Sequence, residues 1–308
     1  MEIKEKTFYA AFVMTYKRPS ILLETINKLF DQTFPPQVVL IVDNDPDKSA
    51  LGITNSFPKD KVQYYNVGYN SGPAGGAYFG MKLLFEQNWD WVLWTDDDDP
   101  PVFEDSIQNI FSLLNQYKGK KPIGIIGAVG ANFNRFKGSI TRISSGKIEG
   151  IQIVDYIGGS MSPIVNKQIF NKSILPNHDL FFGFEDLLFC LQVKKAGFEI
   201  VILGSEMLRW REKFNRLYIS TTSNNLPDIS TLWRQYYSVR SLFTILYREE
   251  RVVIGLFYFI FKTVFKSFLG YKKGFSYGNK YAKIHLLGLY HGMIGKNGCV
   301  LLPEKKYA

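Results

Sequence analysis

The stretch Trp89-Asp90-Trp91-Val92-Leu93-Trp94-Thr95-Asp96-Asp97-Asp98-Asp99-Pro100-Pro101 changes abruptly from bulky apolar residues to four carboxylates and two prolines. The apolar half is typical of a β-strand, and neither a strand nor a helix interior tolerates such a run of charge and proline. Adjacent like charges repel, and a hard cation with oxygen ligands, Mg²⁺ or Mn²⁺, is the usual reason to keep them together at the end of a buried strand. A helix cap or a solvated turn uses the same residue types, so the stretch alone leaves these interpretations open.

Length and composition favour a large globular protein. The chain has 308 residues, of which 46% are hydrophobic, so we expect one large domain or one domain with an appendage. Its two cysteines, Cys190 and Cys299, are far apart in sequence and indicate neither a disulfide framework nor a metal site. Residues 1–7 lead directly into a strand and lack the apolar core of a signal peptide. These features predict a cytoplasmic protein.

The positive charge is concentrated near the C-terminus. The net charge is +9, and the segment from Arg251 to Pro303 contains no Asp or Glu. Its positive side chains are Arg251, Lys262, Lys266, Lys272, Lys273, Lys280, Lys283 and Lys296. Such a segment favours an anionic partner, either a membrane leaflet or a polyanion.

Strands and helices alternate over the first 130 residues. Apolar residues at helical spacing predict three helices, one that begins at Pro19, one that ends near Glu86 and one from Glu104 to Tyr117. Apolar runs that predict strands cover residues 8–14, 38–42, 62–67, 89–95 and 123–129. Because these strands do not alternate between apolar and polar residues, they indicate a mostly parallel sheet with helices on both faces, hence an α/β fold.

Polar residues follow three of these strands, at the sheet edge where such folds bind ligands. They are Asp43, the segment 70–76 and the run Asp96 to Asp99. The glycines of segment 70–76 do not match a dinucleotide fingerprint, and a tight turn into a helix is the alternative. Because two other polar clusters lie at the same sheet edge, we expect this segment to provide a flexible backbone that can approach a nucleotide closely at a helix N-terminus.

The pattern changes after Gly130. Residues 135–150 predict a hairpin and residues 154–157 a short strand. Glu185 and Asp186 then lie in or before the first turn of a helix that ends near Gly197, where carboxylates also serve as caps. Aromatic residues precede them and predict a partly dry pocket of the kind a catalytic base needs, at Phe181, Phe182 and Phe184.

Five short segments stand out when the chain is taken as a whole. They are Thr15-Tyr16-Lys17-Arg18-Pro19, Val42-Asp43-Asn44, Asn66 to Gly76, Thr95 to Asp98, and Glu185 to Cys190. Their order and spacing resemble those of the family 2 glycosyltransferases of GT-A fold. Over residues 8–245 the chain is most similar to the bacterial branch of galactofuranosyltransferases and rhamnosyltransferases. A later segment, Trp233 to Ser241, is similar to a helix of that branch, with Ser241 in place of Asn.

The resemblance implies a role for each matching position. Asp43 would bind the pyrimidine base of the donor, and Asp96 and Asp98 would form a D-x-D element that holds a divalent metal, Mn²⁺ or Mg²⁺, on the diphosphate. Asp186 would be the general base, with Glu185 beside it, in an inverting single displacement. The positions implied to lie at the nucleotide are Thr15, Arg18, Asp43, Asn70, Gly72, Gly75, Asp96 and Asp97.

One departure from the family affects the metal assignment. Many relatives complete the metal shell with a His downstream of the catalytic Asp, whereas the corresponding region here reads Leu208-Arg209-Trp210-Arg211-Glu212. Either Glu212 or water would take the place of the His, or Arg209 or Arg211 would meet the diphosphate directly. Arg209, Trp210 and Arg211 are therefore expected near the diphosphate or the acceptor.

An intensely apolar run, residues 252–261, precedes Lys262. Ten residues are too few to span a bilayer, and with Lys262 and Lys266 one turn apart the segment fits a basic amphipathic helix lying in a membrane interface. A core helix, or a helix in a homo-oligomer interface, is the alternative.

Together these features predict a GT-A catalytic domain over residues 1–228, with a nucleotide-binding half (1–130) and an acceptor half (131–228). A C-terminal basic helical region that associates with membranes would cover residues 229–308. The expected partners are a UDP-sugar or dTDP-sugar donor, with galactofuranose or rhamnose, and a glycan or lipid-linked glycan acceptor at the inner face of the cell membrane. Nucleic acid is not expected, because the acidic sheet edge would repel phosphate without a metal. A non-catalytic nucleotide-sugar-binding or polyanion-binding protein is the alternative.

Overall fold

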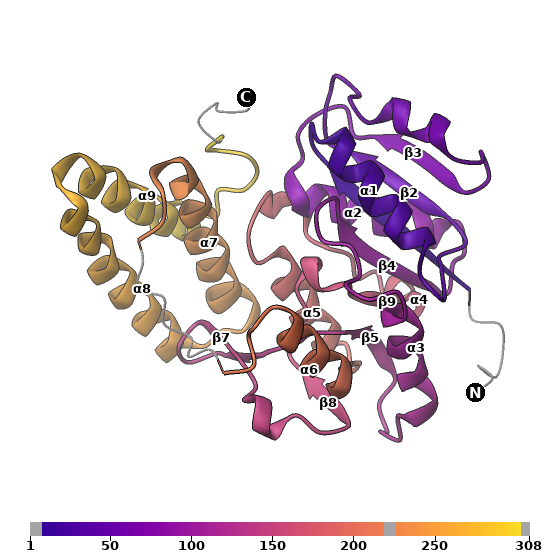
Figure 1. The fold of residues 1–308 in the computed structure, drawn as a ribbon. Coiled ribbons are helices and arrows are strands. Elements are labelled where there is room, and N and C mark those ends of the chain that lie inside the picture. The colour runs from indigo at the N-terminus through magenta and orange to yellow at the C-terminus, as the bar shows by residue number, and fades with distance from the viewer. Residues whose placement is uncertain (1–7, 219–225, 303–308) are drawn as a thin grey trace.

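The computed structural model describes residues 8–218 and 226–302, and an eight-stranded sheet forms its centre (Figure 1). The spatial order is β3-β2-β1-β4-β9-β5-β10-β8. The five strands predicted before residue 130 are confirmed, with ends shifted by one or two residues. The strands are β1 (Tyr9–Thr15), β2 (Val39–Asp43), β3 (Val62–Asn66), β4 (Trp91–Asp96), β5 (Ile123–Gly127), β8 (Ile151–Val154), β9 (Ile164–Asn166) and β10 (Glu199–Leu203).

The sheet is mostly parallel, as predicted. Strands β3, β2, β1 and β4 run parallel to one another, and so do β5 and β10. Strand β9 lies antiparallel between β4 and β5, and β8 lies antiparallel at the edge beside β10. Strand β9 was not predicted, because three residues are too few to show a periodicity.

Helices cover both faces of the sheet. Alternate residues of β1 point to opposite sides, with Tyr9 and Val13 in one apolar core and Phe12 and Met14 in the other. The first core contains side chains of α1 (Pro19–Phe30) and α3 (Ser106–Gln116). The second contains side chains of α2 (Gly72–Glu86), α4 (Lys167–Phe170), α5 (Glu185–Lys195) and α6 (Gly204–Lys213).

The glycine-rich stretch is helical from Gly72 onward, so the alternative of a tight turn into a helix describes it better than a flexible loop. A Cβ atom on Gly76 would lie 2.9 Å from the sulfur of Met14, and one on Gly80 would lie 2.4 Å from the ring of Phe12. These glycines let α2 lie close against β1, so their small size serves helix–sheet packing.

The region after Gly130 differs from its prediction. The hairpin is short and consists of β6 (Asn132–Asn134) and β7 (Ser139–Thr141), joined through Gly138, which has φ +54°. The following strand is β8, which ends at Val154 instead of spanning residues 154–157. Tyr156 lies beyond the end of β8, where its backbone pairs with Ala131 and its hydroxyl donates to Asp186 of α5.

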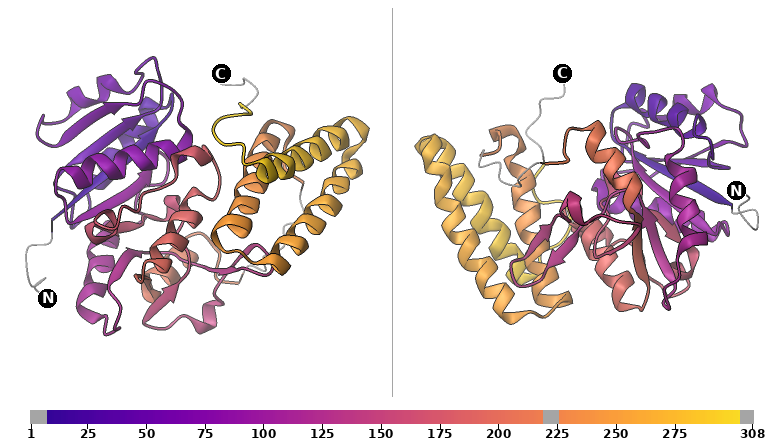
Figure 2. Two further views of the ribbon diagram at one scale, coloured as in Figure 1. Left: turned by 180° about the vertical axis from the view of Figure 1, so that it is seen from behind. Right: turned by 60° about the horizontal axis from the view of Figure 1, so that its bottom comes forward.

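Three long helices follow the sheet and pack on one another beside it (Figures 1 and 2). They are α7 (Leu232–Thr244), α8 (Val253–Phe268) and α9 (Phe275–Ile294). Glycines of α9 allow a close approach to α7, since a Cβ on Gly292 would lie 2.9 Å from Phe243. The predicted domain boundary at residue 228 stays a prediction, and the expectation for residues 1–7 falls outside the described residues.

Candidate active site

A cavity of about 480 Å³ opens at the carboxyl ends of β1, β2 and β4. It contains most of the side chains that were predicted to bind a nucleotide. Its walls include Thr15, Arg18, Asn70, Gly72 and all four aspartates from Asp96 to Asp99, together with Met14, Tyr16, Asn44, Pro73, Phe181, Phe182, Trp233 and Arg234.

Asp97 organises the acidic run from inside. Its side chain is fully buried, accepts a hydrogen bond of 2.7 Å from Thr15 Oγ1 and forms an ion pair with Arg18. Arg18 also donates to Asp98 Oδ2 over 2.6 Å, and both of these side chains are nearly half exposed. The buried carboxylate therefore orients a guanidinium group that remains accessible from the cavity.

The remaining carboxylates crowd one another. Burial raises the pKa of Asp96 to about 8, with further contributions from the charges of Asp99, Asp98, Asp97 and Asp186. Burial also raises the pKa of Asp97 to about 6, although Thr15 and Arg18 oppose the rise. Asp96 therefore lies where a positive charge would relieve a large electrostatic cost.

A divalent cation fits this site only together with a substrate. In the part of the chain that the structure describes, no three His, Cys, Asp or Glu side chains form a group that could hold a metal ion. Mg²⁺ typically binds through one or two carboxylates and completes its shell with water and substrate phosphates. Asp96 and Asp98 offer oxygen ligands of that kind, so the donor set fits a cation carried on a diphosphate.

The carboxylate of Asp43 lies behind the cavity wall. It accepts hydrogen bonds from the backbone N–H groups of Asp45 and Ala50 and from the hydroxyl of Tyr64, at 2.8, 3.1 and 2.9 Å. Its neighbour Asn44 lines the cavity instead. The structure thus does not bring Asp43 to the cavity surface, and its contact with a base stays a prediction.

Gly75 is also turned away from the cavity. A Cβ atom there would lie 2.3 Å from the side chain of Ser71, inside the first turn of α2. Asn70 and Gly72 reach the cavity wall, where Asn70 Oδ1 accepts a hydrogen bond of 3.0 Å from the backbone N–H of Gly72.

A second cavity, of about 270 Å³, contains Glu185 and Asp186. It shares Met14, Pro73, Asp96 and Phe182 with the first cavity, so the two are lobes of one cleft. The predicted general base and the predicted metal ligand therefore face adjoining spaces.

The contacts of Asp186 fix its orientation. Its Oδ2 atom accepts hydrogen bonds from the hydroxyl of Tyr156 at 2.8 Å and the backbone N–H of Gly159 at 3.1 Å. Its Oδ1 atom accepts from the backbone N–H of Leu187 at 2.7 Å. Burial raises the pKa of Asp186, and the hydrogen bond from Tyr156 limits the rise. A raised pKa makes this carboxylate a better proton acceptor than an exposed aspartate.

Glu185 differs from its neighbour. It is buried, its Oε2 atom has no hydrogen-bond partner within residues 8–218 and 226–302, and burial followed by the charge of Asp186 raises its pKa well above the usual range. Phe184, just before it, has φ +65°, as Phe181 has φ +64°. A bulky residue rarely adopts this conformation, so the aromatic segment carries backbone strain beside the carboxylates.

The sequence profile of "Glycosyl transferase family 2" matches residues 11–164, half of the chain. The chain belongs to this family. The matched segment contains most of β1, all of β2 to β4 and the acidic run, and thus most of the first cavity. The family resemblance drawn from the sequence motifs is confirmed.

Curated relatives with partial matches are named as galactofuranosyltransferases. Galactofuranosyltransferase GlfT1 of Mycolicibacterium smegmatis is 28% identical over 107 residues, covering 35% of each chain. GlfT1 of Mycobacterium tuberculosis H37Rv is 35% identical over 91 residues, covering 29% of each chain. The matches thus span about a third of these relatives' length.

Solved structures of other proteins share the fold. The mannosyltransferase PcManGT from Pyrobaculum calidifontis, in complex with GDP-Man and Mn²⁺, covers 95% of this chain and 88% of its own, with 10% identity and a TM-score of 0.52. TarS of S. aureus in complex with UDP covers 94% and 92%, with 14% identity and a TM-score of 0.50. The GT-A fold is confirmed.

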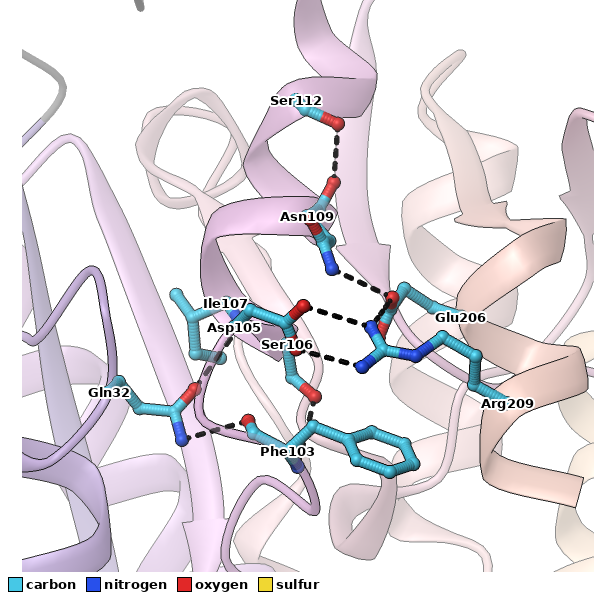
Figure 3. A network of polar contacts seen from close by, with 9 residues as sticks. All are labelled: Gln32, Phe103, Asp105, Ser106, Ile107, Asn109, Ser112, Glu206 and Arg209. Carbon is cyan, nitrogen blue, oxygen red and sulfur yellow. Dashed lines mark hydrogen bonds and ion pairs between the residues drawn. The ribbon is translucent and has the colours of Figure 1, made fainter. Parts of the chain in front are cut away.

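The basic cluster of α6 lies outside the cleft of this family 2 protein. Arg209 donates to Asp105 and Glu206 and stacks on the ring of Phe103, in the network that joins α3 to α6 (Figure 3). Arg211 is buried and donates to Ser145, and Glu212 is exposed. Trp210 lines a separate small cavity with Pro100 and Pro101. The structure does not bring Arg209, Trp210 or Arg211 to the acidic run.

Several side chains of the cleft were not assigned a role from the sequence, among them Asn44, Tyr156, Trp233 and Arg234. Trp233 and Arg234, at the start of α7, and Asn44, just after β2, line the first lobe together with the acidic run. Tyr156 holds Asp186. The segments Trp233 to Ser241 and Val42 to Asn44 had marked three of them through their resemblance to the family. No local pattern marked Tyr156, which lies 30 residues from its partner.

Proposed function

We propose that the protein is an inverting glycosyltransferase that moves a sugar from a nucleoside diphosphate to a hydroxyl group of a glycan. The observation that carries this proposal is the two-lobed cleft, in which Asp96 faces both lobes and Asp186 lies in only one. A donor diphosphate beside Asp96 would place its sugar toward Asp186, and an acceptor could then enter from the second lobe.

The donor we propose is a UDP-sugar or a dTDP-sugar. Arg18 and Arg234 are the guanidinium groups in the wall of the first lobe, and either can pair with phosphate oxygens. Galactofuranose is favoured as the sugar by the partial likeness to GlfT1, and UDP by the TarS complex. Rhamnose remains the second choice from the sequence motifs.

The residues of the cleft support a single displacement. Asp186 accepts the proton of the acceptor hydroxyl. The oxygen of that hydroxyl bonds to the anomeric carbon, and the bond from that carbon to the diphosphate oxygen breaks. The nucleoside diphosphate leaves with the electron pair, and attack from the opposite side inverts the configuration. Mn²⁺ or Mg²⁺ held by Asp96 and Asp98 would supply charge neutralisation for the leaving diphosphate.

The order of substrates can be inferred from the cleft. Phe182 lies in the walls of both lobes, and the strained segment that carries it leads directly into Glu185 and Asp186. A bound donor would cover Phe182 and exclude water from the second lobe, which strengthens electrostatic interactions there. We propose that the donor binds before the acceptor.

The acceptor we propose is a growing bacterial surface polysaccharide, such as an O-antigen, capsule or cell-wall glycan, linked to a lipid at the inner face of the cell membrane. The basic C-terminal region supports this location. A protein that binds nucleotide sugars without transfer is the alternative.

Thermal unfolding with nucleotides tests the proposal. UDP and dTDP, each with and without Mn²⁺, are added to the purified protein, and a ligand at 100 times its dissociation constant adds about 2.7 kcal/mol to the free energy of unfolding. We expect stabilisation by one of them that requires Mn²⁺. Absence of any response to both nucleotides would refute the assignment of the first lobe.

The variant Asp186→Asn separates transfer from binding. It should lower the transfer rate by about 10² to 10⁴-fold, as loss of a general base does, and leave nucleotide stabilisation unchanged. Asp179→Asn, an exposed substitution in the preceding segment, serves as the control. Equal loss of binding and transfer in Asp186→Asn would show that Asp186 is not the base.

A further inference from the structure

Helix α8 presents a continuous apolar stripe to solvent. Its residues follow one another at intervals of three or four, so they lie on one side of the helix. None has less than 60% of its surface exposed: Ile254 (72%), Phe257 (69%), Phe261 (63%), Phe265 (60%) and Phe268 (60%). Monomeric soluble proteins seldom expose apolar residues that form such a continuous patch.

The opposite side of α8 is already packed. Gly255, Phe259, Thr263 and Ser267 recur every four residues and are buried. A Cβ on Gly255 would lie 2.3 Å from the backbone oxygen of Arg135, in the loop between β6 and β7. The protein therefore holds α8 by its inner side and leaves the stripe of Ile254 to Phe268 facing solvent, with ring contacts between Phe261 and Phe265 and between Phe268 and Tyr271.

Positive charge lies on the helix that carries this stripe and just after it, and negative charge is absent from residues 251–302. The sequence from Arg251 to Leu302 contains no Asp or Glu and eight Lys or Arg residues. Lys262 is exposed on α8 itself, and Lys272 and Lys273 are exposed just after it. An apolar helix face with lysines on its flanks complements the headgroups and acyl chains of an anionic bilayer.

We propose that the stripe Ile254 to Phe268 inserts into the surface of an anionic membrane, with α8 lying in the plane of the bilayer. The aromatic rings enter the boundary between headgroups and acyl chains, and Lys262, Lys272 and Lys273 pair with lipid phosphates. Docking of this face does not depend on the transfer reaction proposed above.

By length alone, α8 and the turn after it could also cross the bilayer. This corrects the expectation that the apolar segment, counted as residues 252–261, is too short to span. The helical segment Val253–Lys273 has 21 residues with a mean hydropathy of 1.5, and by length and composition it could span. A crossing would require Phe259, Thr263 and Ser267 to leave the protein that covers them, and would place Lys262 and Lys266 within the acyl chains. With α8 in the plane of the bilayer, the three residues stay packed against the protein and both lysines stay outside the acyl chains.

A second copy of the chain is a weaker candidate for the same face. Two copies of α8 that meet along the stripe would bring their lysine-rich segments together without an acidic residue between Arg251 and Leu302 to neutralise them. An anionic bilayer removes that repulsion, because each lysine near such a surface gains binding free energy.

The docked orientation has a consequence for the cleft. Helix α7 contributes Trp233 and Arg234 to the first lobe and also packs against α8 and α9. Helix α7 would then separate the cleft from the docked helix α8, and the diameter of such a helix is about 10 Å. An acceptor carried on a lipid could reach the cleft without leaving the bilayer.

Co-sedimentation with vesicles tests the proposal on the full-length protein. One set of vesicles is pure phosphatidylcholine, and the other contains equal parts of phosphatidylcholine and phosphatidylglycerol. We expect binding to the anionic vesicles. The triple variant Phe257→Gln/Phe261→Gln/Phe265→Gln should bind them at least about a hundredfold more weakly.

Two further variants separate the contributions. Lys262→Gln/Lys272→Gln/Lys273→Gln keeps the rings and should also weaken binding to anionic vesicles about a hundredfold, since each lysine contributes about fivefold. Leu51→Gln/Ile153→Gln removes exposed apolar residues of the sheet-containing body and should leave vesicle binding unchanged. Nucleotide stabilisation, measured without vesicles, should be the same in all of these variants.

Three results would overturn the proposal. The first is absence of binding to both kinds of vesicle, together with a dimer in sedimentation velocity that the phenylalanine variant dissociates, which would assign the stripe to a second copy. The second is retention on membranes through an alkaline carbonate wash, which would indicate a crossing helix. The third is equal loss of binding in the Leu51/Ile153 control. Failure of nucleotide stabilisation alone would refute the proposed function and leave this inference intact.

Discussion

At the scale of single residues, Tyr156 determines how Asp186 can act. Its hydroxyl donates to the Oδ2 atom of Asp186 over 2.8 Å and stabilises the ionised carboxylate against the effect of burial. In Tyr156→Phe the pKa of Asp186 should rise further, by about one unit for the loss of a hydrogen bond to a charged group. The acid limb of the pH profile of kcat/KM should therefore move to higher pH.

The companion measurements identify a positioning role. Tyr156→Phe should lower kcat about tenfold and leave the KM for the donor unchanged, because Tyr156 lines only the second lobe. Tyr117→Phe, which removes a hydroxyl bonded to Glu199 far along the sheet, is the control and should keep the parent pH profile. A Tyr156→Phe variant with lower stability but an unmoved acid limb would show that the hydroxyl is only structural.

Asp96 should make the metal-free protein less stable. Because its pKa is raised to about 8 in the folded state, the folded protein binds more protons than the unfolded chain between about pH 4 and pH 8. The free energy of unfolding must therefore fall as the pH rises through this window. Asp96→Asn should remove that dependence and stabilise the metal-free protein at pH 8 by about 1 to 2 kcal/mol.

Urea unfolding at several pH values, with and without Mn²⁺ and nucleotide, measures this effect. The parent protein should regain stability when metal and nucleotide are added, whereas Asp96→Asn should respond little. Asp90→Asn, at an exposed position before the same strand, is the matched control and should retain the parent's pH dependence. An Asp96→Asn protein less stable than the parent at pH 8 would contradict the assignment.

At the scale of elements, the close contact between α2 and β1 supports the floor of the cleft. Gly80→Ala would place a Cβ atom 2.4 Å from the ring of Phe12, which is fully buried. Overpacking of this kind costs about 1 to 3 kcal/mol, and the higher helix propensity of Ala offsets up to about 1 kcal/mol of it. Differential scanning calorimetry should thus show a lower Tm for Gly80→Ala.

Gly52→Ala provides the comparison for this helix contact. Nothing lies within 4 Å of a Cβ atom at Gly52, so this substitution should leave the Tm unchanged or raise it slightly. Equal effects of both substitutions would mean that α2 can shift away from β1 without cost.

The sequence predicted the elements whose patterns are local. Uninterrupted apolar runs such as Val38 to Val42 can only be buried on both faces, so the parallel half of the sheet could be inferred from them. Strand β9 pairs with β4 and β5 through residues far away in the chain, and its three residues carry no period. The glycines of α2 suggested a loop because the residues they pack against, Met14 and Phe12, lie on β1, far away in the sequence.

The residues of the cleft were likewise predictable where the sequence pattern is local. Asp96 to Asp99 and Asp186 stood out because unpaired charge adjoins apolar residues there, and the structure gathers them in adjoining lobes. The position of Arg209 could not be foreseen, since its pairing with Asp105 depends on how α3 meets α6. Physical contacts across long sequence separations decide such positions.

At the scale of the whole molecule, Arg240 couples the C-terminal helices to the cleft. Its side chain is almost fully buried and donates to the backbone oxygens of Leu180 and Gly298, at 2.6 and 2.9 Å. Leu180 directly precedes the strained segment that leads to Asp186. Arg240 lines neither lobe, so any effect of its loss on transfer must pass through the packing between α7 and this segment.

Arg240→Met should therefore lower both stability and activity. It removes two hydrogen bonds from a charged guanidinium group, to the backbone oxygens of Leu180 and Gly298, and we expect a loss of about 3 kcal/mol in the free energy of unfolding, measured by urea titration. Because the segment 180–186 then loses a tether, kcat should fall even at temperatures where the variant is fully folded. Lys28→Met removes the same charge from an exposed position on α1 and should change neither quantity. A destabilised Arg240→Met protein that keeps the parent's kcat would show that the C-terminal helices stabilise the fold without holding the catalytic segment in place.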